Sequence, residues 1–450
     1  MGKDFVRNTF GVSSVEFLWG LGTPVVIEST FLQLFLRNLG ARSVLIGLIP
    51  MLFSVGLALI APLSGTLTAP LTRKRPAVLA THVAASLPIL GLGAYLWLAK
   101  FTFSTLSVFF AAYALFSVGV GMLWPVWQNY LVKIFTTAKA VPALAVMTSS
   151  QSAAKIISSF VILKMVERYS FSARGSALIF CLVGLTFLAG SFMFLVTREP
   201  ESRRQPADRT GFPAGPLRRG IGTLVPGIAS DFRRSAREVV SNPNFLRFLG
   251  TELEYCALAG ILAFYANYAT EFCGVSAPVA SGLFVTLNYA GGITANALLG
   301  WLGLLSLRGK LLVTKSMALA AVPLLCFSCS LASFLIVSFC FGASRGTRMA
   351  VFAPAVKQLS GKDDSTHYFA LAPLLLLPLS AGIPLTAGAL IDRLQALGSW
   401  SYRVVFLGMG VLIVAGILFL LRVRFEGPVA DTSREKLRAP AGRISRIRRR

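Results

Sequence analysis

The stretch "GVSSVEFLWGLGTPVVIESTFLQLFL", residues 11–36, places two carboxyl groups inside a run apolar enough to cross a bilayer. The acids are Glu16 and Glu28. A charged carboxylate at the centre of a bilayer costs roughly 2.5 to 3.5 kcal/mol, so such groups usually face a bundle interior and mark ion or substrate pathways. At about 100° per residue the two acids lie about 120° apart around the helix, and they need different neighbours.

Glu16 shares its helical face with Thr23 and Thr30 at intervals of seven residues, and Trp19 lies beside that face. Pro24 separates the two acids and should loosen the helix, as breaks near transporter binding sites do. We predict that Glu16 faces a central cavity and takes up protons or ligand. The second acid is predicted to pair with a cation or to bind substrate when the site opens outward.

Positive charge occurs at similar depth in two later segments. Lys155 follows Gln151 by one helical turn, and Arg345 and Arg348 are three residues apart and therefore share a face. These three cations suggest an anionic or zwitterionic ligand. An ion pair between helices, such as one between Lys155 and the second acid, is the structural alternative.

The seventh apolar segment carries four more candidates. Glu252 and Glu254 lie about 200° apart near the inner end, where water could partly solvate them, and Tyr255 and Asn267 follow. Glu252 corresponds to Glu16 at an offset of 236 residues, which makes Glu252 a stronger candidate than Glu254.

These side chains need membrane helices to position them. Hydrophobic residues make up 55% of the 450 residues and charged residues 14%, a balance that a water-soluble domain could not bury. Runs of about 20 apolar residues predict an all-α polytopic protein with twelve transmembrane helices. The predicted spans are 12–36, 43–68, 77–98, 104–130, 140–163, 174–197, 246–271, 277–304, 311–330, 331–356, 366–390 and 402–423.

The net charge of +25 comes mainly from basic residues in the short loops after even-numbered spans and in the tail. A preference of basic residues for the cytoplasmic side of a membrane explains this distribution better than nucleic-acid binding does. This bias predicts that both termini are cytoplasmic. We expect a multi-pass protein of a bacterial inner membrane, with an organelle membrane as the alternative.

The predicted spans group into two halves. Residues 1–197 and 246–424 would each form six helices, joined by a basic cytoplasmic linker over 198–245. Residues 425–450 form a basic tail that we expect to contact anionic lipids.

Two loops repeat at a constant offset of 235 residues, where Gly65 matches Gly300 and Arg73 matches Arg308. Lys74 adds a further basic residue to the first loop. A duplicated six-helix unit explains this register, and parallel repeats of this kind occur in transporters. We predict that both loops act in gating.

With its twelve spans, central basic loop and two glycine-to-basic loops, the chain resembles the major facilitator superfamily over residues 10 to 425. The signature after the second helix fits at Gly65, Leu67, Arg73 and Lys74. The chain departs from the signature where the family has an aspartate, because that position is Ala69 in the first half and Leu304 in the second. The first two helices also have a fainter likeness to magnetosome-associated permeases of this superfamily.

The resemblance implies a secondary active transporter that works by alternating access, and the buried carboxylates suggest proton coupling. One alternative is a metal-ion transporter, for iron among others, with Glu16, Glu28 and Glu252 as ligands. Another is a non-transporting membrane scaffold or assembly factor, which the degenerate signature favours.

No nucleotide-binding or hydrolase motif is present, so we expect no enzyme activity and no cofactor. We expect a monomer whose partners are its solute and the bilayer. Cys326 and Cys329 form a CxxC in a predicted span, and we interpret them as small core residues rather than as part of a disulfide.

Overall fold

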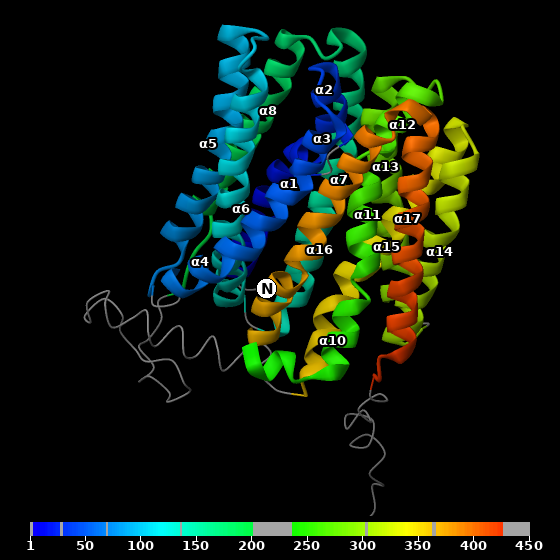
Figure 1. The fold of residues 1–450 in the computed structure, drawn as a ribbon. Helices are drawn as coiled ribbons and strands as arrows, with labels where there is room; N and C mark the ends of the chain where they lie inside the picture. The colour runs from blue at the N-terminus through cyan, green and yellow to red at the C-terminus, as the bar shows by residue number, and fades with distance from the viewer. Residues whose placement is uncertain are drawn as a thin grey trace, which may run out of the picture.

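The computed structural model describes residues 3–27, 30–68, 71–135, 137–200, 236–301, 305–361 and 366–425. Every regular element in these ranges is helical, because backbone groups in a bilayer must be bonded within their own segment. The helices stand side by side in one bundle (Figure 1). The start of α1 and the end of α17 lie at the same end, called here the inner end, and the opposite end is the outer end.

The first half of the chain forms six membrane-length segments. Their elements are α1 (Lys3–Val26), α2 (Thr30–Asn38), α3 (Ser43–Val55), the π-helix η1 (Gly56–Ile60), α4 (Ala61–Thr68), α5 (Arg75–Ala99), α6 (Thr105–Ile134), α7 (Thr137–Tyr169), α8 (Ala173–Phe192) and the short η2 (Met193–Leu195).

The second half repeats this arrangement. Its elements are α10 (Pro243–Gly250), α11 (Leu253–Leu262), α12 (Tyr265–Phe272), α13 (Ala277–Ala295), the π-helix η4 (Asn296–Trp301), α14 (Leu307–Phe327), α15 (Leu331–Ser360), α16 (Thr366–Arg393), the short η5 (Gln395–Leu397) and α17 (Ser399–Arg422).

Within the described residues, nine helices are long and apolar enough to cross a membrane, or ten when the bent pair α1 and α2 counts as one. Together with α13 and α15 they make the twelve expected segments, and the predicted fold class is confirmed. Two predicted single helices are in fact broken. The first segment bends by 41° between α1 and α2, and the seventh consists of α10, α11 and α12.

The two halves share a local irregularity as well as a helix count. A π-helix interrupts the second segment at η1 and the eighth at η4, in each case shortly before the glycine-to-basic loop. Close glycine packing accompanies both. A Cβ on Gly121 would lie 2.2 Å from the carbonyl oxygen of Gly56, and one on Gly346 would lie 2.6 Å from the Cα of Gly292. This correspondence supports the duplication inferred from sequence.

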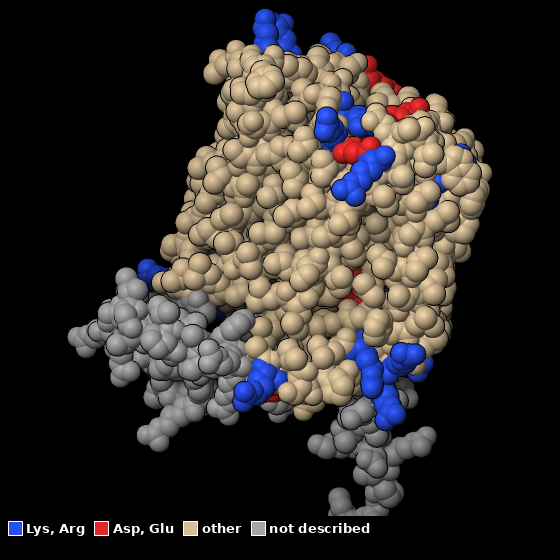
Figure 2. Space-filling view, in the orientation of Figure 1, with Lys and Arg blue, Asp and Glu red and all other residues tan. Residues whose placement is uncertain are grey.

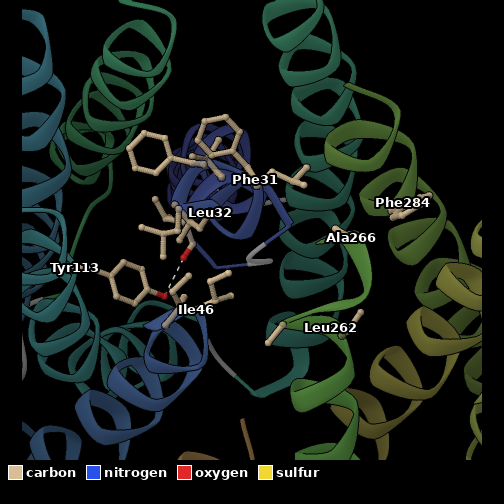
Figure 3. Packing of buried hydrophobic residues seen from close by; sticks show 14 of the residues in the cluster. Phe31, Leu32, Ile46, Tyr113, Leu262, Ala266 and Phe284 are labelled. Carbon is tan, nitrogen blue, oxygen red and sulfur yellow. Dashed lines mark hydrogen bonds between the residues drawn. The ribbon is translucent and has the colours of Figure 1, made fainter. Parts of the chain in front are cut away.

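Helix α2 lies in the core where the two halves meet (Figure 3). Its Phe31 and Leu32 are fully buried. Tyr113 of α6 lies on one side and donates a hydrogen bond of 3.1 Å to the carbonyl of Val26, while Leu262 of α11 lies on the other. The outer part of the first segment is therefore in contact with both halves.

The halves also meet along α3 and α16, where two glycines allow the backbones to touch. A Cβ on Gly388 would lie 2.4 Å from the carbonyl oxygen of Ser43, and one on Gly47 would lie 2.5 Å from that of Pro384. Both oxygens of Asp392 accept backbone N–H bonds from Ser43 and Val44, at 2.8 and 2.9 Å. These contacts close the bundle at its outer end.

Charged side chains gather toward the two ends of the bundle, and a belt of uncharged side chains covers the middle of the face in Figure 2. Large apolar side chains are exposed on many helices, among them Leu98, Leu115, Val411 and Leu418. This distribution suits contact with lipid over the central band.

The cysteine prediction is wrong. Cys329 lies in the connection between α14 and α15 and forms a disulfide with Cys273, just after α12. The predicted boundary near residues 332–333 had placed Cys329 inside a helix, whereas the break falls at 328–330. Cys326 is buried, as expected.

The predicted linker lies largely outside the described residues, and so do residues 426–450 of the tail. The domain boundaries and the lipid contact of the tail therefore stay predictions.

Candidate functional site

Glu16 of α1 lies in a cluster built by three helices of the first half. Gln151 of α7 donates a hydrogen bond from Nε2 to the carboxylate oxygen Oε2. Trp127 of α6 is a second hydrogen-bond partner, and the charge of Lys155 on α7 acts on the same carboxylate. The structure thus brings together three residues that the sequence analysis named separately, Glu16, Gln151 and Lys155.

Lys155 connects this cluster to the other half of the molecule. Its ammonium nitrogen lies 4.8 Å from the ring centroid of Tyr289 on α13, a cation–π contact. Helices α7 and α13 also pack closely, since a Cβ on Gly282 would lie 2.8 Å from the carbonyl oxygen of Ser159. A cation held between a carboxylate of one half and a ring of the other can respond to relative movement of the halves.

Trp19 belongs to the aromatic packing of the first half. Its ring stacks on Phe187 at 4.3 Å and meets the edge of His82 at 5.0 Å. His82 is 3% exposed and its Nδ1 lies 2.8 Å from the carbonyl oxygen of Val78. These contacts give both residues a packing role.

Glu252 and Arg348 form an ion pair within the second half. The guanidinium Nε of Arg348 lies 2.5 Å from Oε2 of Glu252, whose side chain is 2% exposed. The guanidinium also lies over the rings of Tyr255 and Phe352, at 3.8 and 5.0 Å. Two of the predicted residues, Glu252 and Arg348, are thus paired with each other, and Tyr255 packs on them.

Glu254 forms a second and fully buried ion pair. Its carboxylate accepts a 2.8 Å bond from Lys315 of α14 and another from the hydroxyl of Ser344. Lys315 also donates to the carbonyl of Thr251 at 2.8 Å. The expected partial solvation of Glu252 and Glu254 is wrong, because α14, α15 and the helix breaks around Thr251 enclose both acids.

Lys315 was missed by the sequence reading, although a lone lysine in the apolar run "LLVTKSMALAAV" was a visible signal.

Arg345 and Arg348 contact different helices despite their shared face. Arg345 donates a 3.1 Å hydrogen bond to the amide oxygen of Asn288 on α13, and the Asn288 amide donates to the carbonyl of Ser338. Asn267 lies apart from these groups on α12 and is completely buried. The candidate residues therefore form several local clusters rather than one.

The loop between the second and third segments is held by an acid that sequence reasoning missed. Glu199 accepts backbone N–H bonds from Lys74 and Arg75 at 2.8 and 2.9 Å, and its Oε1 lies 2.5 Å from the ammonium of Lys133. Burial alone would raise the pKa of Glu199, but these bonds lower the pKa below the ordinary value of 4.5. Burial and the nearby charge of Lys133 lower the pKa of Lys74.

The other predicted gating residues have simpler surroundings. Arg73 is exposed in the same loop. Arg308 donates a 2.8 Å bond to the carbonyl of Leu421 at the end of α17. Gly65 lies in α4 and Gly300 in η4.

Glu28, Ala69 and Leu304 lie outside the described residues. Within the described ranges, no group of three histidine, cysteine or acidic side chains is placed to hold a metal ion. Glu16 and Glu252, proposed as metal ligands, belong to separate clusters in different halves.

Comparison with known proteins places this arrangement among transporters. A family model described as Major Facilitator Superfamily matches residues 25–372. No curated protein matches the chain significantly.

Solved structures share the fold at low sequence identity. A structure reported for proton dependent oligopeptide transporters has a TM-score of 0.68 at 14% identity and covers 93% of this chain and 98% of its own. The nucleoside transporter NupG has a TM-score of 0.66 at 11% identity, covering 94% and 100%. A bacterial homolog of the human lysosomal transporter Spinster, inward-facing and unoccupied, has a TM-score of 0.65 at 14% identity, covering 94% and 98%.

Proposed function

Because the chain belongs to the major facilitator superfamily, a family of membrane transporters rather than enzymes, we propose that it is a proton-coupled secondary transporter of a small anionic or zwitterionic solute. The observation that carries the proposal is the position of Lys155 between Glu16 and Tyr289, at the contact between the halves. Alternating access requires the halves to rock about such a contact.

The charges at membrane depth support a solute with a negative group. Among the described residues there, four cations accompany three carboxylates: Lys155, Lys315, Arg345 and Arg348 with Glu16, Glu252 and Glu254. Two of the carboxylates are engaged in direct ion pairs within the second half. Lys155 lies at the contact between the halves, and both Lys155 and Arg345 contact side chains of α13.

Coupling would follow from competition for Lys155. When Glu16 is charged, it attracts the ammonium and competes with an anionic solute. When Glu16 is protonated, that attraction is lost and the ammonium can bind the solute instead. The solute and the proton would therefore move together.

Reconstituted transport tests this mechanism. The purified chain is placed in proteoliposomes that contain a pH-sensitive dye, and dicarboxylates, dipeptides and nucleosides are added with and without an imposed pH gradient. We expect at least one probe to enter with protons. Glu16→Gln should abolish gradient-driven uptake but leave exchange at equal concentrations intact, and uptake at the unmutated rate would rule out Glu16 as the coupling group.

A further inference from the structure

An open crevice lies between α7 and α8, with α1 as its floor. A Cβ on Gly20 of α1 would lie 2.8 Å from the carbonyl oxygen of Gln151 on α7, and one on Gly22 would lie 2.4 Å from the ring of Phe187 on α8. At about 100° per residue the two glycines lie about 160° apart around α1. Helices α7 and α8 therefore flank α1 on nearly opposite sides and leave a strip of its surface uncovered between them.

This crevice opens toward the bilayer. It has a volume of about 420 Å³, and its lining includes Phe10, Ser14, Phe17 and Leu18 of α1, Ser150 of α7 and Met193 of η2. Phe10 is 63% exposed. Val146, one turn before Ser150, and Phe192, next to Met193, are exposed as well. Large apolar side chains on the floor and beside both walls suit an apolar occupant from the membrane.

The floor of the crevice changes from basic to apolar along α1. Lys3, Arg7, Phe10, Ser14 and Phe17 follow one another at alternating intervals of four and three residues, so they share one face of the helix. Lys3 and Arg7 are exposed at the inner end. Phe17 lies about 15 Å further along the axis than Arg7, which is half of a hydrocarbon core about 30 Å thick. The stripe therefore spans one leaflet, with its charges at headgroup depth.

The basic mouth of the crevice has a net positive charge. Arg7 donates a 2.6 Å hydrogen bond from Nε to the carbonyl of Val196, just after η2, which holds the guanidinium between α1 and the wall formed by η2. A guanidinium has five N–H donors, so this bond leaves donors for a phosphate. Lys3 and Arg198 add two further cations, and Asp4, which pairs with Arg198 at 3.3 Å, is the acid beside them.

A buried hydroxyl lies deeper in the crevice. Ser13 also lines it, and its hydroxyl oxygen is buried without a hydrogen-bond partner among the described residues. Such a group destabilises the protein until a partner arrives. In a phospholipid the ester carbonyl groups lie between the phosphate and the acyl chains. Ser13 lies between Arg7 and Phe17 along α1 and is therefore placed to donate to an ester carbonyl.

We propose that the crevice binds one anionic phospholipid from the leaflet at the inner end. Its phosphate binds Lys3 and Arg7, and one acyl chain lies along Phe10 and Phe17. Glu16 is half a turn of the helix away from Arg7, so the lipid occupies a different side of α1 from the candidate transport site. The proposal does not depend on transport activity.

Photolabelling of the full chain tests this site. The protein is placed in nanodiscs of unlabelled phosphatidylcholine that contain a small fraction of phosphatidylglycerol with a diazirine in the middle of one acyl chain. A phosphatidylcholine with the same modified chain is the matched probe. After irradiation, mass spectrometry locates the labelled residues. We expect labelling of Phe17 and Leu18 to be at least about fivefold stronger with the phosphatidylglycerol probe, the usual effect of one basic residue beside an anionic headgroup.

Variants of the mouth separate charge from folding. Arg7→Gln should weaken labelling by the phosphatidylglycerol probe about fivefold. Arg7→Lys keeps the charge and should retain most of the labelling. Lys3→Gln should also weaken labelling, and it leaves the bond between Arg7 and Val196 intact. The control Arg174→Gln removes an exposed arginine at the start of α8, at the outer end, and should change labelling less than about twofold because the charge lies beyond the screening length.

Equal labelling of the floor by the two probes would identify ordinary annular lipid and overturn the proposal. Labelling spread over the exposed face of α7 instead of the floor would also overturn it, as would equal effects of Arg7→Gln and Arg174→Gln. Failure to transport any solute would contradict the proposed function and would leave these labelling ratios unchanged.

Discussion

Substitutions in the buried ion pair of Lys315 and Glu254 can test whether this pair stabilises the fold or takes part in transport. Lys315→Met keeps the length of the side chain but leaves Glu254 without its cation, with the hydroxyl of Ser344 as its remaining hydrogen-bond donor among the described residues. The two side chains are 1% and 2% exposed, so water cannot replace the lost partner. Breaking a buried pair on one side costs about 3 to 5 kcal/mol.

That free energy corresponds to a loss of roughly 150-fold to 5,000-fold in the folding equilibrium. The double variant Lys315→Met with Glu254→Gln removes both charges and keeps the shape of the site. It should recover most of the stability, because a neutral replacement of a buried ion pair is often close to neutral in free energy. The two substitutions should therefore be strongly non-additive.

The measurement is an unfolding titration of the purified chain from mixed micelles into SDS, followed by loss of helical circular dichroism. If Lys315→Met alone is as stable as the double variant, the assignment of a stabilising pair is refuted. Transport by the double variant adds a second result: full activity makes the pair structural, whereas a stable but inactive variant makes it part of the transport mechanism.

Three further predictions follow from other contacts. Lys155→Ala should reduce uptake at least tenfold. The control Lys164→Ala should reduce uptake less than twofold, because Lys164 is on the same helix but its side chain is 76% exposed beside Glu167. Equal effects of the two substitutions would remove Lys155 from the site. Glu199 has a lowered pKa, so its stabilising contribution is present above pH 4.5 and is lost as the pH falls through its folded-state pKa. The Glu199→Gln variant should therefore lose less thermal stability than the unmutated chain between pH 5 and pH 3, roughly the range of carboxyl titration. The same pH profile in both proteins would contradict a stabilising role of Glu199 in this loop. A thiol-specific reagent should label Cys273 in intact cells only after treatment with an impermeant reductant, and labelling from the cytoplasmic side instead would reverse the proposed topology.

Sequence patterns predicted faces of helices better than contacts between them. The seven-residue interval of Glu16 and the one-turn spacing of Gln151 and Lys155 fix which side chains point the same way, and the structure brings these residues together. Helical periodicity does not say which helix packs against which, and it gave no preference for pairing Lys155 with Glu16.

The lengths of apolar runs predicted helix boundaries less well where a break in the backbone divides a segment. Breaks around Thr251 and Phe264 divide the seventh segment and enclose Glu254, which an unbroken helix would have left near the solvated end. The three-residue connection before Leu331 frees Cys329 from the helix and allows its disulfide. Such breaks depend on packing against neighbouring helices, and a single sequence carries little information about that packing.

The repeat also explains why the two halves need not do the same work. Glu16 and Glu252 occupy equivalent positions, yet their partners differ in charge. Glu252 is in a direct ion pair with the guanidinium of Arg348. Glu16 is hydrogen-bonded to the neutral Gln151, and its cation also contacts the other half through Tyr289. A change of charge on Glu16 therefore has a route to affect the contact between the halves. This asymmetry is the physical reason to seek proton coupling in the first half and structural support in the second.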